Sequence, residues 1–341
     1  MVSIEPAAPT ATEPEEQQTP TVTEDPTVWE RKDLLDTDTL SAEEIDLVLE
    51  TADAMAEVRE RPVGRVATLR GTTVVTLFYE NSTRTRASFE IAAKALGADV
   101  INLAAAGSSV GKGESLVDTV RTIEAVGADV VVMRHPNSGA AALAARHTSA
   151  SVVNGGDGSH AHPTQALLDL YTMRRHVGEI EGRKVVIVGD ILHSRVARSN
   201  LWALQAAGAQ VTLCGPATLL PQSLRSLPGY EGPGGCEVTT DLEGALTGAD
   251  VVMALRIQRE RQDQGLLPSL REYIRQYQIT EERLARANAG ALVMHPGPMN
   301  EGVELAPEVA HGLRSVVEEQ VTNGVAVRMA ILYLMATARR Q

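Results

Sequence analysis

Short apolar runs alternate with amphipathic stretches along the chain from about residue 34 onward. The apolar runs predict strands at Thr73–Phe78, Asp99–Leu103, Asp129–Arg134, Ala150–Asn154, Lys184–Val188, Gln210–Cys214, Asp250–Leu255 and Ala291–Met294. Helices are predicted from a capping box at Ser41–Glu44 through about Arg59, and at Ser88–Leu96, Ser115–Val126, Ala140–His147, Pro163–His176 and Val316–Ala336. Near-continuous apolar strands separated by helices indicate parallel sheets that are covered on both faces. The pattern predicts an α/β protein of two doubly wound domains joined by helices.

The chain has 341 residues, which is more than one typical domain. Residues 1–28 are rich in Pro, Thr, Glu and Gln and contain few large apolar side chains, so we expect a disordered acidic tail there. The first domain is expected at 29–168 and the second at 169–315. The remaining segment, 316–341, is expected to form a helix that packs back on the first domain.

The composition excludes several classes of protein. Aromatic residues make up 3% of the chain and the formal net charge is −13, so neither a base-stacking surface nor the basic face of a nucleic-acid-binding protein is expected. Residues 1–30 carry −7 of that charge, which leaves −6 for the rest and allows an anion to bind where basic residues converge. No run of about 18 apolar residues predicts a membrane span, and no secretory signal pattern opens the chain. A cytoplasmic protein without a nucleic-acid or membrane partner is expected.

Six polar motifs follow predicted strands. They are Ser82–Arg86, Arg134–Pro136, Gly155–Gln165, Gly189–Arg195, Arg256–Gln258 and His295–Asn300. In open α/β sheets, ligands bind beyond the carboxyl ends of the strands. We therefore expect the active site at these strand ends, in the cleft between the two domains.

The motif Ser82-Thr83-Arg84-Thr85-Arg86 lies between an apolar strand and a predicted helix. Backbone N–H groups at a helix start, together with hydroxyls and a guanidinium, form an anion site. Arginine suits phosphate because its planar fork donates two parallel hydrogen bonds. The same residues also fit a simple helix cap with solvated arginines, so the sequence supports both interpretations.

A Gly- and Ser-rich loop holds Ser108 and Lys112 shortly before a predicted helix. It lacks the spacing of a P-loop, which argues against a nucleotide triphosphatase. A lid over a ligand and a mobile surface loop both fit its composition.

Two further motifs would bring a cation and an imidazole to the expected active site. Arg134-His135-Pro136 places a guanidinium at a strand end, and His162-Pro163-Thr164-Gln165 opens a helix. His162 could donate a hydrogen bond to a carbonyl oxygen on which negative charge develops, or it could simply cap the helix. No set of Cys, Asp or His residues completes a coordination sphere around it, so no metal is expected.

The second half of the chain contains residues whose side chains can donate hydrogen bonds to the carboxylates of a ligand. Arg195, Arg256 and Gln258 could grip a dicarboxylic amino acid through forked hydrogen bonds, and Arg198 and Arg259 are nearby alternatives. The segment from residue 185 begins like a Rossmann unit but lacks G-x-G-x-x-G, which disfavours a dinucleotide.

The turn that starts at His295 contains Pro296, Gly297 and Pro298. Such a rigid turn presents backbone carbonyls, which could accept hydrogen bonds from a substrate amine. A stiff exit from the last strand is the other interpretation.

Taken in chain order, the Ser82–Arg86, Arg134–Pro136 and His162–Gln165 motifs resemble the aspartate/ornithine carbamoyltransferase family over about residues 33–340. Arg256-Ile257-Gln258-Arg259-Glu260-Arg261 is similar to the aspartate-binding segment of that family, and the Ser-Met-Gly and His-Cys-Leu-Pro signatures of its ornithine branch do not occur. The resemblance implies a carbamoyl phosphate-binding first domain, an aspartate-binding second domain and transfer of the carbamoyl group to the α-amine of aspartate. It implies neither a cofactor nor a metal.

The resemblance also implies a role for each matched residue. Carbamoyl phosphate would be held by Ser82, Thr83, Arg84, Thr85, Arg134, His162, Gln165, Pro296 and Gly297, and by Ser108 and Lys112 of a neighbouring subunit. Aspartate would be held by Lys112, Arg195, Arg256 and Gln258. Among these, Arg84, Thr85, Arg134, His162 and Gln165 would be the catalytic residues. The sharing of sites implies at least a homotrimer, which a regulatory chain or a dihydroorotase could join in a higher assembly.

Three other functions remain as alternatives. One is a carbamoyltransferase for another amine, such as ornithine; another is a ligand-binding scaffold subunit without activity. The third is a nicotinamide-dependent oxidoreductase, which the missing glycine fingerprint disfavours. A cationic second pocket would attract the side-chain carboxylate of aspartate and repel the ammonium group of ornithine, which favours aspartate.

Overall fold

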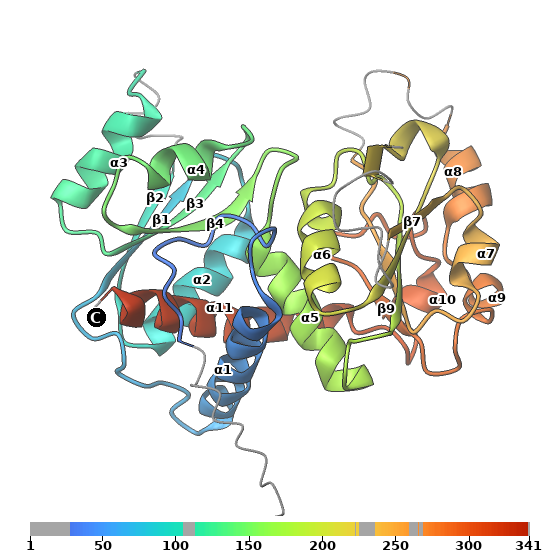
Figure 1. The fold of residues 1–341 in the computed structure, drawn as a ribbon, viewed down its shortest axis with the longest axis horizontal. Helices are drawn as coiled ribbons and strands as arrows, with labels where there is room; N and C mark the ends of the chain where they lie inside the picture. The colour runs from blue at the N-terminus through green and yellow to red at the C-terminus, as the bar shows by residue number, and fades with distance from the viewer. Residues whose placement is uncertain are drawn as a thin grey trace, which may run out of the picture.

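Two parallel β-sheets, each flanked by helices, make up most of the molecule (Figure 1). The computed structural model describes residues 28–104, 113–221, 223–224, 236–258, 265 and 269–339. The expected acidic tail at 1–28 therefore lies almost entirely outside the described residues. Both sheets are built from apolar strands connected through helices, so the predicted α/β class with two parallel-sheet domains is confirmed.

The first sheet has the strand order β2-β1-β3-β4, and all its pairings are parallel. Its strands are β1 (Thr73–Phe78), β2 (Asp99–Ala104), β3 (Val130–His135) and β4 (Ser151–Asp157). The helices that follow β1, β2 and β3 are α2 (Thr83–Ala95), α3 (Leu116–Ala125) and α4 (Ala140–Ala145). Buried valines dominate β1 and β3, as a sheet covered on both faces requires.

The second sheet has the order β7-β6-β5-β8-β9 and is also parallel. Its strands are β5 (Lys184–Val188), β6 (Gln210–Cys214), β7 (Cys236–Thr239), β8 (Val251–Ala254) and β9 (Leu292–Met294). The helices around it are α6 (Arg195–Ala206), α7 (Leu242–Leu246), α8 (Leu270–Tyr277), α9 (Glu281–Leu284) and α10 (Pro307–Ala310), with a 3-10 turn η2 at Ala217–Leu219. In both sheets the order of the strands reverses beside the first strand, between β1 and β3 and between β5 and β8, and ligands bind at such switch points.

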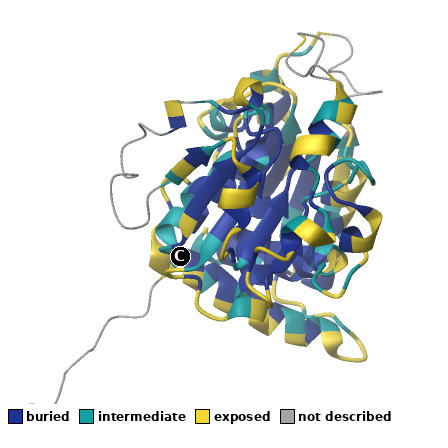
Figure 2. Cartoon of the chain, turned by 90° about the vertical axis from the view of Figure 1, so that its right-hand side faces the viewer, coloured by how far each residue is buried: buried dark blue, intermediate teal, exposed yellow. Residues whose placement is uncertain are grey.

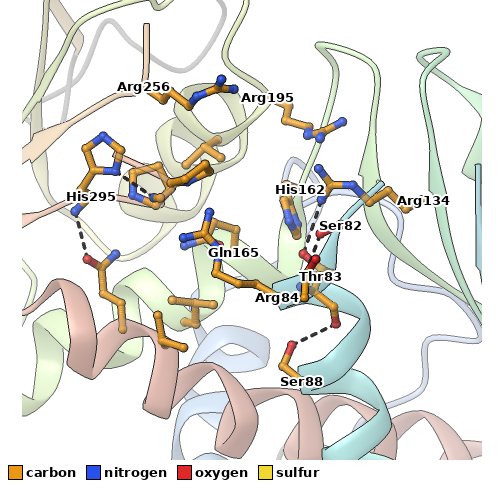
Figure 3. A pocket seen from close by; sticks show the side chains of 18 of the residues that line it. Ser82, Thr83, Arg84, Ser88, Arg134, His162, Gln165, Arg195, Arg256 and His295 are labelled. Carbon is orange, nitrogen blue, oxygen red and sulfur yellow. Dashed lines mark hydrogen bonds between the residues drawn. The ribbon is translucent and has the colours of Figure 1, made fainter. Parts of the chain in front are cut away.

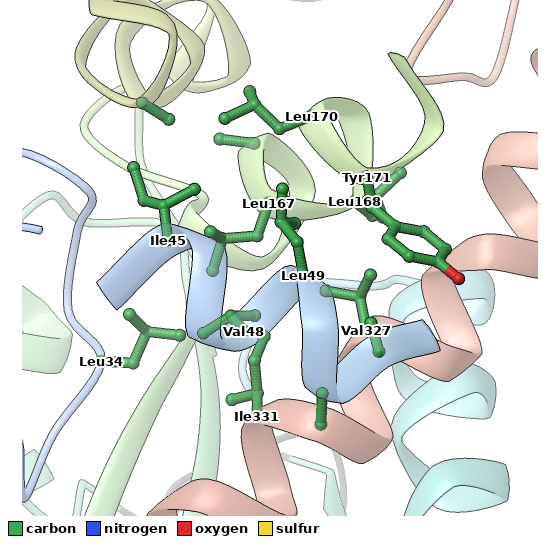
Figure 4. Packing of buried hydrophobic residues seen from close by; sticks show 14 of the residues in the cluster. Leu34, Ile45, Val48, Leu49, Leu167, Leu168, Leu170, Tyr171, Val327 and Ile331 are labelled. Atoms are coloured by element: carbon green, nitrogen blue, oxygen red, sulfur yellow. The ribbon is translucent and has the colours of Figure 1, made fainter. Parts of the chain in front are cut away.

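Three long helices connect the two halves. They are α1 (Ala42–Glu60), α5 (Pro163–Val177) and α11 (Val317–Ala338), and α11 packs on α1, α2 and α5. Figure 4 shows Val48 and Leu49 of α1 packed between Leu167 of α5 and Ile331 of α11. The expected domain boundary at 168/169 falls inside α5, which runs unbroken from one half to the other. The expected boundaries themselves remain predictions.

Burial follows the strands. Figure 2 shows the buried residues concentrated along the central strands, with exposed residues on the outer helices and loops. The helix α11 is long and apolar enough to pass a length-and-composition test for a membrane span, but 72% of its apolar window is buried inside the protein. Its apolar character is therefore explained by its place in the core, beneath α1 and α2.

Two sequence predictions are wrong in detail. The strand β7 was not predicted, because Cys236–Thr239 is short and carries a charged residue, Glu237, in its middle. The helix α2 begins at Thr83, five residues before the predicted start. Ser82 is its N-cap, with Ser82 Oγ accepting from the Thr85 backbone N–H at 3.4 Å, so the Ser82–Arg86 motif forms the first turn of the helix rather than the loop before it.

Candidate active site

A cavity of about 750 Å³ lies between the two sheets and is lined from both of them (Figure 3). The predicted site residues that line it are Ser82, Thr83, Arg84, Thr85, Arg134, His162, Gln165, Arg195, Arg256, Gln258, Pro296 and Gly297. Ser108 and Lys112 lie outside the described residues. The structure thus brings together every predicted site residue that it describes, although the outermost of them are more than 200 positions apart in the chain.

One wall of the cavity is the first turn of α2. Ser82, Thr83, Arg84 and Thr85 of this turn all line the cavity. The Thr85 backbone N–H donates to Ser82 Oγ, whereas the first N–H groups of a helix have no acceptor within the helix and can bind a ligand. The positive end of the helix dipole adds to the attraction for an anion. Burial lowers the pKa of Arg84, and the neighbouring Arg256 lowers it further, so two cations lie close together on this side of the cavity. This wall is well suited to phosphate.

Arg134 lies where β3 meets the cavity. The register between β3 and β4 shifts at this point, and such an irregularity can redirect a side chain toward a site. Arg134 Nη1 donates to the Gly155 carbonyl at 3.1 Å and to Thr85 Oγ1 at 3.4 Å, while Arg134 Nη2 donates to Glu80 Oε1 at 3.3 Å. These contacts hold the guanidinium beside the first turn of α2, within the cavity.

His162 is the N-cap residue of α5 and is 5% exposed. Burial, and then the nearby cations Arg134, Arg195 and Arg328, hold its pKa well below the usual value. The imidazole is therefore neutral at physiological pH, with one N–H to donate. Within the described residues His162 Nδ1 has no hydrogen-bond partner, and its side chain caps no helix N–H, so the structure favours a role in the cavity over simple capping.

The opposite wall comes from the second sheet. Arg195 is the first residue of α6, and Arg256 and Gln258 follow β8. Gln258 Nε2 donates to the His193 carbonyl at 3.2 Å, which orients its carboxamide. Of the two alternatives, Arg198 donates to the Leu192 carbonyl and is not among the lining residues, whereas Arg259 lies outside the described residues.

Glu80 joins the two walls and was not singled out from the sequence. Its carboxylate accepts two hydrogen bonds from Arg195, both at 3.0 Å, and one from Arg134. These ion pairs hold its pKa below the usual value even though burial acts in the opposite direction. A glutamate two residues before Ser82 was the available signal, but its partner Arg195 is 115 residues away. Glu80 thus positions the two arginines relative to each other.

The turn after β9 closes the cavity. His295 Nδ1 accepts from the Gly297 backbone N–H at 2.8 Å, which shapes the turn. Burial, then Arg84 and Arg256, lower the pKa of His295 to about 3, so this imidazole is neutral as the bond requires. Gly297 has φ +61°, and a Cβ at this position would collide with the Arg84 guanidinium. Because Gly297 has no side chain, the Arg84 guanidinium can lie directly against this turn.

The charge of the cavity is opposite to that of the chain. Its lining includes five arginines (Arg84, Arg134, Arg195, Arg256 and Arg328) and one glutamate (Glu80), which gives a net charge of +4 with both histidines neutral. Within the described residues no three His, Cys, Asp or Glu side chains gather as a metal-binding group. The cavity is therefore built to hold more than one anionic group at once.

Gly156 provides a test of this geometry. It has φ +117°, and a Cβ there would lie 3.1 Å from Arg195 Cζ and 3.3 Å from Arg134 Nη1. We expect Gly156→Ala to displace both guanidiniums and to lower the affinity for an anionic ligand by about 10-fold or more, as small misplacements in a site do. The matched control is Gly127→Ala: Gly127 also has a positive φ, +96°, but a Cβ there meets no atom within 4 Å. Equal losses of affinity in the two variants would contradict this account, because they would trace the effect to backbone strain alone.

Comparison with known proteins agrees with this geometry. A family model described as the carbamoyl-P binding domain of aspartate/ornithine carbamoyltransferase matches residues 32–175, and one described as the Asp/Orn binding domain matches residues 181–335. The aspartate carbamoyltransferase catalytic subunit of Chloroflexus aggregans is 60% identical over 306 residues, covering 90% of this chain and 98% of that protein. That of Moorella thermoacetica is 59% identical, covering 90% of this chain and 97% of the relative.

Solved structures resemble this fold over nearly its whole length. Aspartate transcarbamoylase from Trypanosoma cruzi, in complex with carbamoyl phosphate and aspartate, superposes with a TM-score of 0.81 at 30% identity, covering 89% of this chain and 97% of that chain. Ornithine carbamoyltransferase from Pyrococcus furiosus superposes with a TM-score of 0.80 at 30% identity, covering 89% and 96% of the two chains. The chain belongs to the aspartate/ornithine carbamoyltransferase family.

Proposed function

We propose that this protein transfers the carbamoyl group of carbamoyl phosphate to the α-amine of L-aspartate, giving N-carbamoyl-L-aspartate and phosphate. This product is a precursor in de novo pyrimidine (UMP) biosynthesis. The observation that carries the proposal is the single cavity in which the N-terminus of α2 and Arg134 face Arg195 and Arg256. One wall suits a phosphate and the other suits carboxylates, so two anionic substrates meet between them.

Carbamoyl phosphate binds against α2 in this proposal. Ser82, Thr83, Arg84 and Thr85 hold its phosphate, and Arg134 reaches both the phosphate and the carbonyl oxygen. The neutral His162 donates its N–H to the same carbonyl oxygen. Because these donors are fixed before the reaction, they stabilise the negative charge that develops on this oxygen when the amine attacks.

The carbamoyl –NH2 group needs acceptors rather than donors. Gln165 and the Pro296 backbone carbonyl supply them, and Gly297 leaves space for Arg84 beside them. Aspartate binds on the other wall, where Arg195, Arg256 and Gln258 hold its two carboxylates. The tetrahedral intermediate then expels phosphate, and the departing phosphate takes the proton of the amine.

Charge balance supports aspartate as the acceptor. Carbamoyl phosphate brings about two negative charges, and aspartate with a neutral amine brings two more, against the net +4 of the cavity. Ornithine would place an ammonium group beside Arg195 and Arg256, which is unfavourable in a partly buried site. The direct test is carbamoyl transfer by the purified protein to aspartate, ornithine and putrescine side by side. Turnover with aspartate alone is expected, whereas turnover with ornithine alone would overturn the assignment.

The proposal includes an assembly of identical chains in the cytoplasm. Ser108 and Lys112 of one subunit complete the site of the next in a homotrimer, with Lys112 contacting both substrates. A regulatory chain or dihydroorotase could join such a trimer in a higher assembly. No cofactor, metal, nucleic acid or membrane takes part in the reaction as proposed.

If each active site is shared between two subunits, two inactive variants can restore activity when their subunits are mixed. His162→Ala and Lys112→Ala damage opposite sides of each shared site, so each variant alone is expected to be nearly inactive. Random mixed trimers would contain sites with both sides intact, and the mixture is expected to regain about a quarter of wild-type activity. Activity that stays at the level of the separate variants after dissociation and reassociation would show that the sites are not shared.

A further inference from the structure

Three carboxamides converge on one buried carboxylate behind the cavity. Asp169 of α5 is 0% exposed. Asp169 Oδ1 accepts from Gln165 Nε2 at 2.9 Å and from Gln320 Nε2 at 2.7 Å, and Asp169 Oδ2 accepts from Asn200 Nδ2 at 2.9 Å. The carboxamides come from α5, α11 and α6, so the carboxylate ties together helices from both halves of the molecule.

A carboxylate accepts hydrogen bonds and donates none, so it determines which end of each carboxamide faces it. Gln165 must present its –NH2 to Asp169. Its carbonyl oxygen, Oε1, is then the end left for the cavity that Gln165 lines. With the opposite orientation, the side chain would offer a donor to the cavity, where a carbamoyl –NH2 needs an acceptor.

The same carboxylate also acts on the turn after β9. Because Gln320 donates to Asp169, its Oε1 is free to accept, and it does so from the His295 backbone N–H at 3.0 Å (Figure 3). His295 in turn accepts from the Gly297 N–H at 2.8 Å. The position of the Pro296 carbonyl between these two residues therefore depends on the orientation of Gln320.

We propose that Asp169 is a positioning residue that turns the Gln165 carboxamide oxygen and the Pro296 carbonyl toward the cavity, so that the site prefers an acyl phosphate bearing –NH2 on its acyl carbon. The inference rests on the proposed function and adds to it the origin of selectivity for a carbamoyl group. Asp169 itself touches no substrate. It acts through Gln165 and Gln320.

Acetyl phosphate is the matched probe, because it carries –CH3 in place of –NH2 and makes no demand for an acceptor. The wild-type protein is expected to bind carbamoyl phosphate more tightly than acetyl phosphate in a calorimetric or competition titration. In Asp169→Ala the Gln165 carboxamide is free to turn, and the ratio of the two affinities is expected to fall by about 10-fold, with acetyl phosphate affinity nearly unchanged. An unchanged ratio of the two affinities, whether or not both ligands bind more weakly, would overturn the inference.

Asp169→Asn serves as the conservative variant. An asparagine keeps one oxygen for Gln165 and Gln320, while its –NH2 would face Asn200. Within the described residues Asn200 Oδ1 has no hydrogen-bond partner, so Asn200 can turn over and accept from the new donor, although it then gives up the hydrogen bond from Nδ2 to the Val196 carbonyl. We therefore expect Asp169→Asn to retain most of the preference for carbamoyl phosphate. Loss of the preference to the same extent as in Asp169→Ala would contradict positioning by hydrogen-bond acceptance.

The wild-type protein offers a second readout if Asp169→Ala does not fold. Burial raises the pKa of Asp169 to about 6, although three hydrogen bonds and Arg328 of α11, the charged group that acts on it, oppose the shift. Protonation below that pH turns one acceptor into a donor, so the affinity ratio should fall as the pH drops through about 6. A ratio that stays constant while infrared difference spectroscopy shows Asp169 taking up a proton would overturn the inference. A wild-type protein that binds no carbamoyl phosphate at all would instead overturn the proposed function.

Discussion

Replacing Arg134 with alanine is expected to lower kcat/KM for carbamoyl transfer by about 10³-fold or more, the largest effect of any single substitution in the cavity. Arg134 is held by the Gly155 carbonyl, Thr85 and Glu80 at the centre of the site. In the proposed function its guanidinium binds both the phosphate and the carbonyl oxygen of the substrate. Steady-state kinetics with carbamoyl phosphate and aspartate varied separately would measure the loss.

The control for Arg134 is Arg174→Ala. Arg174 is also in an ion pair, with Asp53 at 2.6 Å, but it is not among the residues that line the cavity. This variant should keep wild-type kcat/KM. Arg134→Lys should recover only part of the activity, because an ammonium group cannot donate two parallel hydrogen bonds from a plane. If Arg134→Ala retained wild-type kcat/KM, the proposed contact with the reacting carbonyl would be wrong.

Arg256→Ala is expected to have the second-largest effect, an increase of about 100-fold in KM for aspartate, because removing one arginine of a forked pair leaves a substrate carboxylate without its partner. Binding of carbamoyl phosphate alone should change far less, since Arg84 and Arg134 remain. Arg256 also lowers the pKa of Arg84, so the two guanidiniums lie close enough to repel each other.

Arg271→Ala is the matched control for Arg256. Arg271 is exposed on α8 of the same half and does not line the cavity, so its removal should leave both KM values unchanged. An equal rise in KM for carbamoyl phosphate and for aspartate in Arg256→Ala would place Arg256 in the phosphate half of the site.

Much of the fold could be predicted from the sequence because apolar strands leave a strong signal. The predicted bounds of β1, β5 and β6 coincide with the observed ones. The strand β7 escaped prediction because an edge strand needs fewer apolar residues, and Glu237 interrupts its short run. The start of α2 was placed too late because Thr83–Arg86 contains no apolar residue, whereas the Ser82 cap sets the true start.

Residues of the candidate site that follow strands could be predicted from the sequence, whereas residues inside helices could not. Arg134 and Arg256 stand at strand ends, so the rule for parallel sheets located them. Asp169, Gln320 and Arg328 lie within helices that look like ordinary core segments, and only the tertiary fold brings them together. The Asp169–Gln320 hydrogen bond spans 151 residues, a separation at which sequence patterns carry no information.

In the proposed function one cavity holds a phosphate and an aspartate at the same time, with Arg134 and Arg256 on opposite sides. Calorimetric titration with N-(phosphonacetyl)-L-aspartate, which joins both groups in one molecule, tests it most directly. We expect binding at least about 100-fold tighter than that of phosphate or succinate alone, and weaker binding in both Arg134→Ala and Arg256→Ala. Binding no tighter than that of phosphate, or binding unaffected by Arg256→Ala, would contradict it.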